Sequence, residues 1–372
     1  MLRSVSLLLI LLVSGFASLV AAANDEKPFG IRVVDGETRR GVPLVELVTT
    51  AQEVFITDSL GWVTIREPEL VGREVHFAIR SPGYEAPKDG FGIVGQRLRI
   101  EPGKTATITL TRRQLAERLY RTTGLGIYRA SRELGIADLP PEPSAAAGIA
   151  GCDSVLVTRY GGKLHWFWGD TPSIGYPLGN FHMTGATTEL SAKGLSLSER
   201  PPHYCYFLKP EGGVKPMMPM PGDGPTWMGG LVTLKDETGR ERMVAGYSKI
   251  RGGLESHRWG LAIWSDELDQ FEPLVEFPAG KVNYPVSQNH TFLVSDGRTK
   301  EAVEDDGYLY FCQPFPLMRV KRTLAAMKEI GQYEGYTCEV AGSTEAEPKL
   351  ERDAAGKLVH AWRPGVRPVT AE

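Results

Sequence analysis

The sequence has few cysteines, little net charge and none of the common metal-binding motifs. Its four cysteines include no Cys-x-x-Cys pair, which speaks against a structural zinc site. The peptidase zinc motif His-Glu-x-x-His is also absent. A formal net charge of -3 offers no electrostatic basis for binding nucleic acid. After the N-terminal segment, no apolar run reaches the ~18 residues that a membrane-spanning helix needs.

The first residues have the pattern of a secretory signal peptide. Arg3 precedes an apolar run from Val5 to Val20, and the small residues Ala21 to Ala23 follow. This arrangement predicts a signal peptide over residues 1–23 and a secreted or periplasmic protein. The alternative is an uncleaved membrane anchor, because the run is nearly long enough to span a bilayer.

The four cysteines, Cys152, Cys205, Cys312 and Cys338, leave two alternatives open. In an oxidising compartment three disulfide pairings are possible, and the sequence does not choose among them. Three of the four lie in apolar, strand-like settings, which favours buried free thiols. No cofactor or metal is expected. The spacing around Asp305 and Asp306 does not fit a calcium loop, and Met217, Met218 and Met220 look like a loop packing on the core.

Residues 28–112 contain short apolar stretches separated by turn residues. With 42 glycines and 26 prolines in the chain, this spacing predicts an all-β protein that begins with a small β-sandwich of about seven strands. The segments 33–44 (VVDGETRRGVPL), 57–62 (TDSLGW) and 82–84 (PGY) resemble the carboxypeptidase regulatory-like, or transthyretin-like, domain. The resemblance implies a non-catalytic accessory or docking module, or a spacer.

Residues 113–150 are expected to form a helical and Pro/Ala-rich linker. Leu115, Leu119 and Tyr120 recur at helical spacing, and a second short helical stretch is expected over 127–134. The prolines and alanines of 138–148 then lead into the next domain.

From Gly151 onward, strand-like segments return in repeated groups. The first group begins with a hairpin, Ser154–Tyr160 and Lys163–Gly169, joined at Gly161-Gly162. The remaining expected strands are Thr184–Ser191, Tyr204–Lys209, Gly230–Leu234, Glu241–Tyr247, Trp259–Trp264, Leu274–Phe277, Thr291–Val294, Tyr308–Gln313 and Tyr336–Ala341. Groups of three or four strands predict a β-propeller over 151–372.

The second domain resembles the five-bladed propeller glycoside hydrolases of the family 43 type. The resemblance rests on an aspartate before the first strand, on Gly-Lys-Leu-x-Trp-Phe at 162–167 and on Trp-Ser-Asp-Glu-Leu at 264–268, and it covers about 151–342. Residues 151–372 are expected to supply about three and a half of the five blades that this propeller type needs for closure. Either the chain is a truncated version of a longer protein or the tail supplies irregular closing strands. Truncation is the favoured expectation, because an open propeller would expose unpaired strand edges, which soluble proteins avoid. The tail, 343–372, lacks a strong strand pattern.

The aspartates Asp153 and Asp170 stand at the outer ends of the first hairpin, so their carboxyl groups can approach one mouth. The resemblance places the catalytic base at Asp153. The expected carboxylates of the second and third blades are missing, and His290 stands where the acid would be. Histidine can donate a proton near neutral pH, so Asp153, His290 and Asp170 are the catalytic candidates. Asp170 has an alternative role in capping the turn at Thr171-Pro172.

Other residues near predicted strand ends are candidates for binding a substrate. Trp168 and Trp227 can stack on sugar rings. The polar candidates are Lys249, Arg251, His257 and Glu334. Lys249 and Arg251 could instead belong to a solvated loop, and His165 to a packed strand.

The sequence therefore supports two hypotheses. The first is an exported carbohydrate-active or carbohydrate-binding protein that holds a saccharide or cell-surface glycan at the propeller mouth. The second is a non-catalytic surface or periplasmic docking module. Under either hypothesis we expect no nucleic-acid partner and no membrane span once the signal peptide is cleaved. The sequence does not indicate the oligomeric state.

Overall fold

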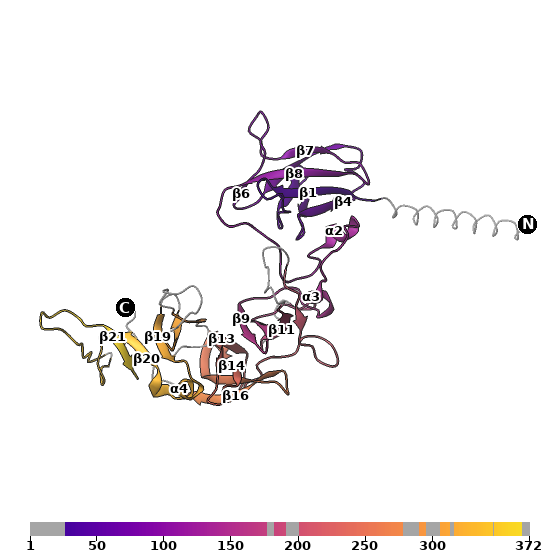
Figure 1. The fold of residues 1–372 in the computed structure, drawn as a ribbon. Coiled ribbons are helices and arrows are strands. Elements are labelled where there is room, and N and C mark those ends of the chain that lie inside the picture. The colour runs from indigo at the N-terminus through magenta and orange to yellow at the C-terminus, as the bar shows by residue number, and fades with distance from the viewer. Residues whose placement is uncertain are drawn as a thin grey trace, which may run out of the picture. The chain divides into compact units, whose positions relative to one another are not determined.

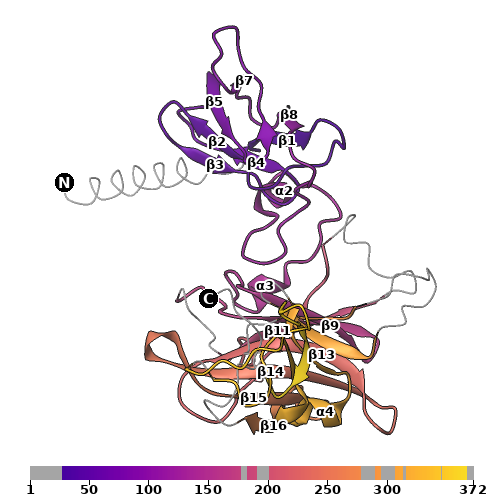
Figure 2. The ribbon, with the colours of Figure 1, turned by 90° about the vertical axis from the view of Figure 1, so that its left-hand side faces the viewer.

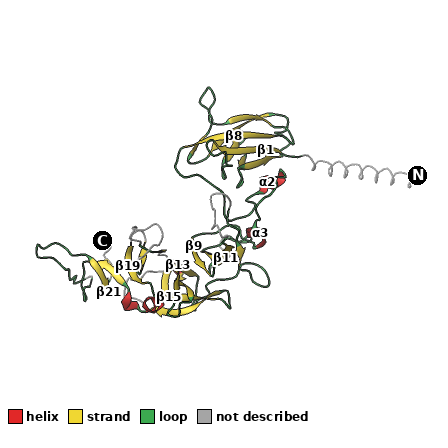
Figure 3. Ribbon diagram, viewed as in Figure 1, coloured by secondary structure: helices red, strands yellow, loops and turns green. Residues whose placement is uncertain are grey.

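The computed structural model describes residues 27–176, 182–190, 201–277, 290–294, 306–312, 316–344 and 346–366 (Figure 1). The predicted signal peptide, 1–23, lies outside them. The chain divides into two compact units. Of the described residues, one unit comprises 27–122, 126–142 and residue 201, and the other comprises 123–125 and the remainder from residue 143 onward. Strands dominate both units and the helices among the described residues are short, which confirms the all-β prediction (Figure 3).

The first unit is a sandwich of two four-stranded sheets (Figure 2). One sheet has the order β4 (Trp62–Ile65), β1 (Phe29–Asp35), β8 (Thr105–Arg112), β6 (Tyr84–Glu85). The other has the order β3 (Val54–Ile56), β2 (Glu46–Thr49), β5 (Glu74–Arg80), β7 (Gln96–Arg99). Alternate residues of each strand point inward, as Val75, Phe77 and Ile79 do in β5. The buried cluster confirms the expected sandwich, with eight strands where about seven were predicted.

The helix predicted near Leu115 does not form. The first α-helix among the described residues is α2 (Arg129–Glu133), and Leu115 is fully exposed. The Arg118 guanidinium instead donates to the carbonyl oxygens of Pro43 and Pro82, at 2.8 Å each. These contacts hold residues 113–122 against the sandwich in a non-helical conformation. The helical spacing of Leu115, Leu119 and Tyr120 did not determine the structure here. The tertiary contacts of Arg118 outweigh the weak local preference for a helix.

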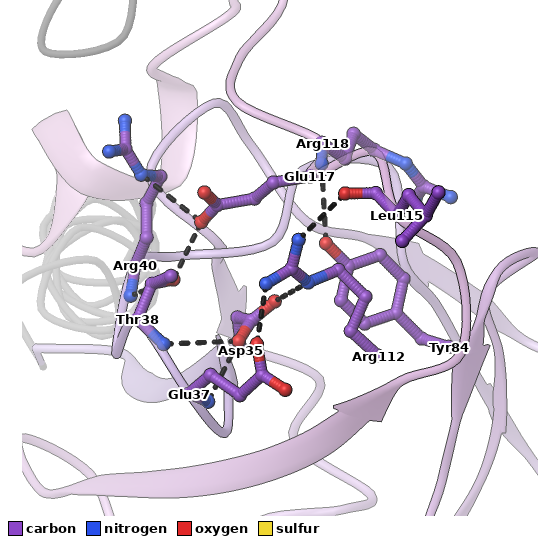
Figure 4. A network of polar contacts seen from close by, with 9 residues as sticks. All are labelled: Asp35, Glu37, Thr38, Arg40, Tyr84, Arg112, Leu115, Glu117 and Arg118. Atoms are coloured by element: carbon purple, nitrogen blue, oxygen red, sulfur yellow. Dashed lines mark hydrogen bonds and ion pairs between the residues drawn. The ribbon is translucent and has the colours of Figure 1, made fainter.

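A polar network supports this arrangement (Figure 4). The fully buried Asp35 pairs with Arg112 at 3.0 Å, and Arg112 also pairs with Glu37 at 2.6 Å. Nearby, Glu117 accepts a hydrogen bond from Thr38 at 2.6 Å. The buried charge of Asp35 is thus compensated by a guanidinium and by backbone N–H groups.

Residues 126–142 are also fastened to the sandwich. The carboxylate of Asp58 accepts the N–H groups of Leu60 and Trp62 on Oδ1 and that of Ser131 on Oδ2, at 2.9, 3.1 and 2.7 Å. One aspartate therefore closes the turn before β4 and captures the first turn of α2. Much of the expected linker is part of the first unit.

The second unit contains three antiparallel sheets among its described residues, and the strands of each follow in chain order. The first sheet comprises β9 (Val155–Tyr160), β10 (Lys163–Trp168), β11 (Thr184–Glu189) and β12 (Cys205–Tyr206). The second comprises β13 (Thr226–Lys235), β14 (Glu241–Arg251), β15 (Glu255–Ser265) and β16 (Gln270–Phe277). The third comprises β17 (His290–Phe292), β18 (Tyr308–Cys312), β19 (Pro316–Lys321), β20 (Glu334–Thr337) and β21 (Ala361–Pro364).

The first strands of the three sheets lie together, with β13 in contact with both β9 and β17. Four-stranded meanders with neighbouring first strands have the topology of propeller blades. Strand β21 corrects one expectation, because it lies in the tail that was expected to lack strands. It pairs with β20 through partners such as Tyr336 and Trp362.

Short helical elements complete the second unit. They are α3 (Pro143–Ala146), α4 (Leu324–Lys328) and the 3-10 turns Gly252–Leu254 and Ile330–Gln332. The side chain of Thr323 caps α4 by accepting from the N–H of Ala326 at 3.1 Å. Met327, from α4, is buried in the cluster between the second and third sheets.

The hairpin at 155–168 forms as predicted. Gly161 and Gly162 have φ values of 56° and 78°, the left-handed conformation that a two-residue hairpin turn requires. The methionines Met217, Met218 and Met220 are buried in the core, as expected. His165 is also buried, against Tyr160 and Trp264, in line with a packing role.

The cysteines whose side chains the structure describes, Cys152, Cys205 and Cys338, are free thiols. Cys338 is buried as expected and Cys152 is partly buried, whereas Cys205 is exposed, so the expectation of a buried thiol was wrong there. The side chain of Cys312 lies outside the described residues.

Candidate functional site

A pocket of about 360 Å³ opens in the second unit where the first strands of its three sheets begin. It is lined by Asp153, Ser154, Leu156, Gly169, Asp170, Met183, Trp227, Met228 and His290. Four of the nine residues proposed from the sequence are in this list: Asp153, Asp170, Trp227 and His290. They come from three segments of the chain between residues 153 and 290, and the sheet topology brings them together.

The hairpin places the two aspartates side by side. The backbone N–H of Asp153 donates to the carbonyl oxygen of Asp170 at 2.9 Å, and that of Gly169 donates to the carbonyl oxygen of Asp153 at 3.1 Å. These bonds join the chain entering β9 to the chain leaving β10. Asp153 is exposed, and its Oδ1 accepts the N–H of Ser154 at 2.6 Å.

The two carboxyl groups differ in their surroundings. Asp170 is partly buried, and this burial, followed by the charge of Asp153, raises the pKa of Asp170. Asp153 is solvent-exposed. Asp170 keeps its proton to a higher pH, and Asp153 beside it is exposed. Two carboxyl groups in such different surroundings can serve one as an acid and the other as a base.

The other walls provide an indole, an imidazole and apolar surface. Trp227 is the second residue of β13 and partly exposed, and His290 opens β17 and is exposed. Leu156, Met183 and Met228 are buried apolar residues behind them. No local pattern in the sequence singles out these three. Leu156, for example, lies between Val155 and Val157, which are exposed, so apolar alternation does not distinguish it.

Five proposed residues do not line this pocket. Trp168 is buried and packs against Trp166 and Tyr204 at centroid distances of 6.4 and 5.1 Å. Lys249 is 1% exposed, and its Nζ donates to the carbonyl oxygen of Gly224 at 2.5 Å. Desolvation by burial lowers the pKa of Lys249.

The remaining three are engaged elsewhere. Arg251 ends β14 and pairs at 2.8 Å with Glu255, which begins β15. Both are exposed, but they lie in strands and not in the loop that was the alternative for Arg251. His257 Nε2 lies 3.2 Å from the carbonyl oxygen of Asp223. Glu334 accepts a hydrogen bond from Arg319 at 2.6 Å on the third sheet.

The described parts of the chain contain no group of three or more His, Cys, Asp or Glu side chains placed to hold a metal ion. Within the same residues, none of the helices is both long enough and apolar enough to cross a membrane.

Comparison with known proteins gives little further information. No family model and no curated protein matches this sequence. Among solved structures, the crystal structure of "a putative hydrolase" from Bacteroides ovatus ATCC 8483 aligns with a TM-score of 0.33 and 13% identity. The alignment covers 59% of this chain and 55% of that one, so the chain spans little more than half of that protein's length. A likeness this weak carries no argument about fold or activity.

Proposed function

We propose that this protein is an exported carbohydrate-binding protein that holds a saccharide in the pocket at Asp153, Asp170, Trp227 and His290. The observation that carries the proposal is the composition of that pocket, which combines a carboxylate pair with a partly exposed indole and apolar side chains. Sugar rings present C–H surfaces that pack on aromatic rings, and hydroxyl groups that bond to carboxylates.

The proposal extends to hydrolysis of a glycosidic bond, and the environment of Asp170 favours this step. An inverting glycosidase uses one carboxylic acid to protonate the leaving oxygen and one carboxylate to activate water. Burial and the neighbouring charge raise the pKa of Asp170, which suits the acid, whereas the exposed Asp153 suits the base. In this proposal His290 is a substrate-binding group, because Asp170 can supply the proton.

A thermal-shift experiment tests the binding proposal. The mature protein is melted with and without short, soluble oligosaccharides of glucose, mannose, xylose and galacturonic acid. A ligand that binds only the native state stabilises it by mass action and so raises the melting temperature. At a ligand concentration of one hundred times Kd, the free energy of unfolding increases by about 2.7 kcal/mol. We expect at least one series to raise it, and Asp153→Asn to reduce that rise.

The control for this experiment is Glu211→Gln, which neutralises an exposed carboxylate outside the pocket. It should keep the full shift. If none of the oligosaccharides shifts a cooperative melt, saccharide binding at the pocket is refuted and the non-catalytic docking module becomes the better account. If a sugar binds but reducing ends never accumulate, the protein binds without cleaving.

A further inference from the structure

The third sheet of the second unit has two faces of different character. Leu309, Phe311, Met318 and Val320 point to one side and are buried in the cluster shared with the second sheet. The opposite side carries mainly aromatic and charged side chains from all five strands. We call this side the aromatic face and define it by Phe292, Tyr308, Tyr310, Arg319, Glu334, Tyr336, His360 and Trp362.

The rings on the aromatic face form a continuous series. Phe292 stacks on Tyr310 at 5.6 Å, and Tyr310 meets Trp362 edge to face at 5.5 Å. Tyr336 contacts Trp362 at 5.2 Å and stacks on His360 at 5.9 Å. The series therefore runs from β17 across the sheet to β20 and β21.

Arg319 fixes this series in place. Its guanidinium lies 3.9 Å from the ring centre of Tyr308 and 4.7 Å from that of Trp362. Its Nε also donates to Glu334 at 2.6 Å. A guanidinium held between two rings and a carboxylate keeps the rings in defined positions.

Part of the aromatic face is open to solvent. Tyr336 is 41% exposed, His360 is exposed, and Phe292, Tyr308 and Trp362 are partly exposed. Exposed rings interspersed with guanidinium, carboxylate and imidazole groups form a surface with apolar planes and polar edges. Oligosaccharides match this chemistry, because each sugar unit has an apolar C–H face and a rim of hydroxyl groups.

The aromatic face begins next to the pocket along strand β17. His290 lines the pocket, and Phe292 follows it two residues later, so both point to the same side of β17. The pocket volume of about 360 Å³ lies near the lower end of the usual range for small-ligand sites, about 300–1,000 Å³. A chain of several sugar units would therefore extend beyond it.

We propose that the aromatic face is a second carbohydrate-binding surface that receives the part of an oligosaccharide or polysaccharide lying outside the pocket. This inference rests on the proposed function for the identity of the ligand, and it specifies that the ligand is a polymer. Tyr336 and Trp362 provide the stacking planes, and Arg319, Glu334 and His360 provide hydrogen bonds at their edges.

Affinity electrophoresis tests the proposal. The mature protein is run in native gels containing soluble β-glucan, mannan, xylan or pectin, and its retardation is compared with that in a gel without polysaccharide. We expect at least one polysaccharide to retard the wild type, and Tyr336→Ala to weaken this binding roughly three- to tenfold. Tyr336→Phe should retain it, because the ring remains. The control Phe91→Ala removes a 92% exposed ring from the first unit and should leave retardation unchanged.

The two binding surfaces can fail separately in this design. Asp153→Asn should reduce the thermal shift by short oligosaccharides yet keep most of the retardation. Unchanged retardation of Tyr336→Ala would overturn the aromatic face while leaving the pocket intact, and His360→Ala repeats the test should Tyr336→Ala not fold. Retardation of the wild type by none of the polysaccharides would overturn the proposal. So would dimerisation that depends on Tyr336, because the occupant would then be a second copy of this chain.

Discussion

The buried core of the sandwich unit consists mainly of valine, isoleucine and leucine, whereas methionine and aromatic residues fill much of the core of the second unit. The sandwich covers the inner faces of both its sheets, and its buried carboxylates Asp35 and Asp58 are bound within the same unit. In the second unit, by contrast, a carboxylate pair lies in a pocket and rings line an exposed sheet face.

This difference between the two units suits them to different roles, stability in the sandwich unit and ligand binding in the second unit. A close-packed aliphatic core with internally compensated charges gives stability and leaves little chemistry available for a ligand. Methionines and aromatic rings fill irregular space between the sheets of the second unit, and the same residue types extend to its surface. Recognition is therefore expected in the second unit, and the following experiments can break or sharpen this contrast.

Removing a core ring from each unit should give the largest effects. Phe77 and Phe167 are both 0% exposed, one in each core. Replacing either with alanine should lower the free energy of unfolding of its own unit by about 3–5 kcal/mol. Differential scanning calorimetry should show each variant shifting a different transition, and only Phe167→Ala should impair the oligosaccharide-induced shift. A single unfolding transition that both variants lower equally would contradict the view that the two units are stabilised by separate cores.

Arg118→Ala should have an intermediate effect. The wild-type guanidinium donates to two carbonyl oxygens and lies over the ring of Tyr84, so its loss should destabilise the sandwich by about 1–3 kcal/mol. Urea unfolding measures the change. Arg121→Ala is the matched control and should change stability by less than about 0.5 kcal/mol. Equal effects of the two variants would show that the contacts of Arg118 do not hold the 113–122 segment.

Gly161→Ala should destabilise the second unit by about 1 kcal/mol. The cost comes from the backbone, because φ is 56° there and a Cβ would meet no neighbour. Gly175→Ala is the control, at a position with open space and no positive φ, and should be close to neutral. If the two variants have the same melting temperature, the positive φ at Gly161 does not disfavour a residue with a Cβ atom as expected.

The smallest expected effect is a pH dependence from Asp170. Its pKa in the native state is raised, so the native protein binds this proton more tightly than the unfolded chain does. Its contribution to stability should be fully present below the ordinary aspartate pKa, near 3.9, and should fall as the pH rises through the raised value. Asp170→Asn should therefore gain stability relative to the wild type between pH 4 and pH 7 in urea titrations. The control Glu211→Gln should not gain stability in this range. If Asp170→Asn instead gained stability only below pH 4, the predicted direction would be wrong.

The sequence sufficed where local chemistry decides the structure. Gly161-Gly162 specified a hairpin turn, and the hairpin then brought Asp153 and Asp170 together. The grouping of strands was enough to place Trp227 and His290 at the same mouth. In each case a short-range signal and a repeated topology determined the outcome.

The sequence was insufficient where tertiary contacts decide. Nothing local indicates that Lys249 is buried against Gly224, or that Arg118 binds the carbonyl oxygens of Pro43 and Pro82 and displaces a helix. Strand β21 was missed because four residues in a charged, proline-rich tail form a strand only by pairing with β20. Such pairings become visible only when the partner strand is known.

The pairing of β1 with β8 has a consequence for the order in which the chain folds. These parallel strands join residues 30–35 to residues 105–110, so the sandwich cannot complete its sheet until nearly the whole first unit has been synthesised. In the meanders of the second unit each strand pairs with its immediate successor, and the hairpin of β9 and β10 closes over only two residues, Gly161 and Gly162. Contact order therefore predicts that the sandwich, although first in the chain, acquires its native sheet more slowly than β9 and β10 form their hairpin.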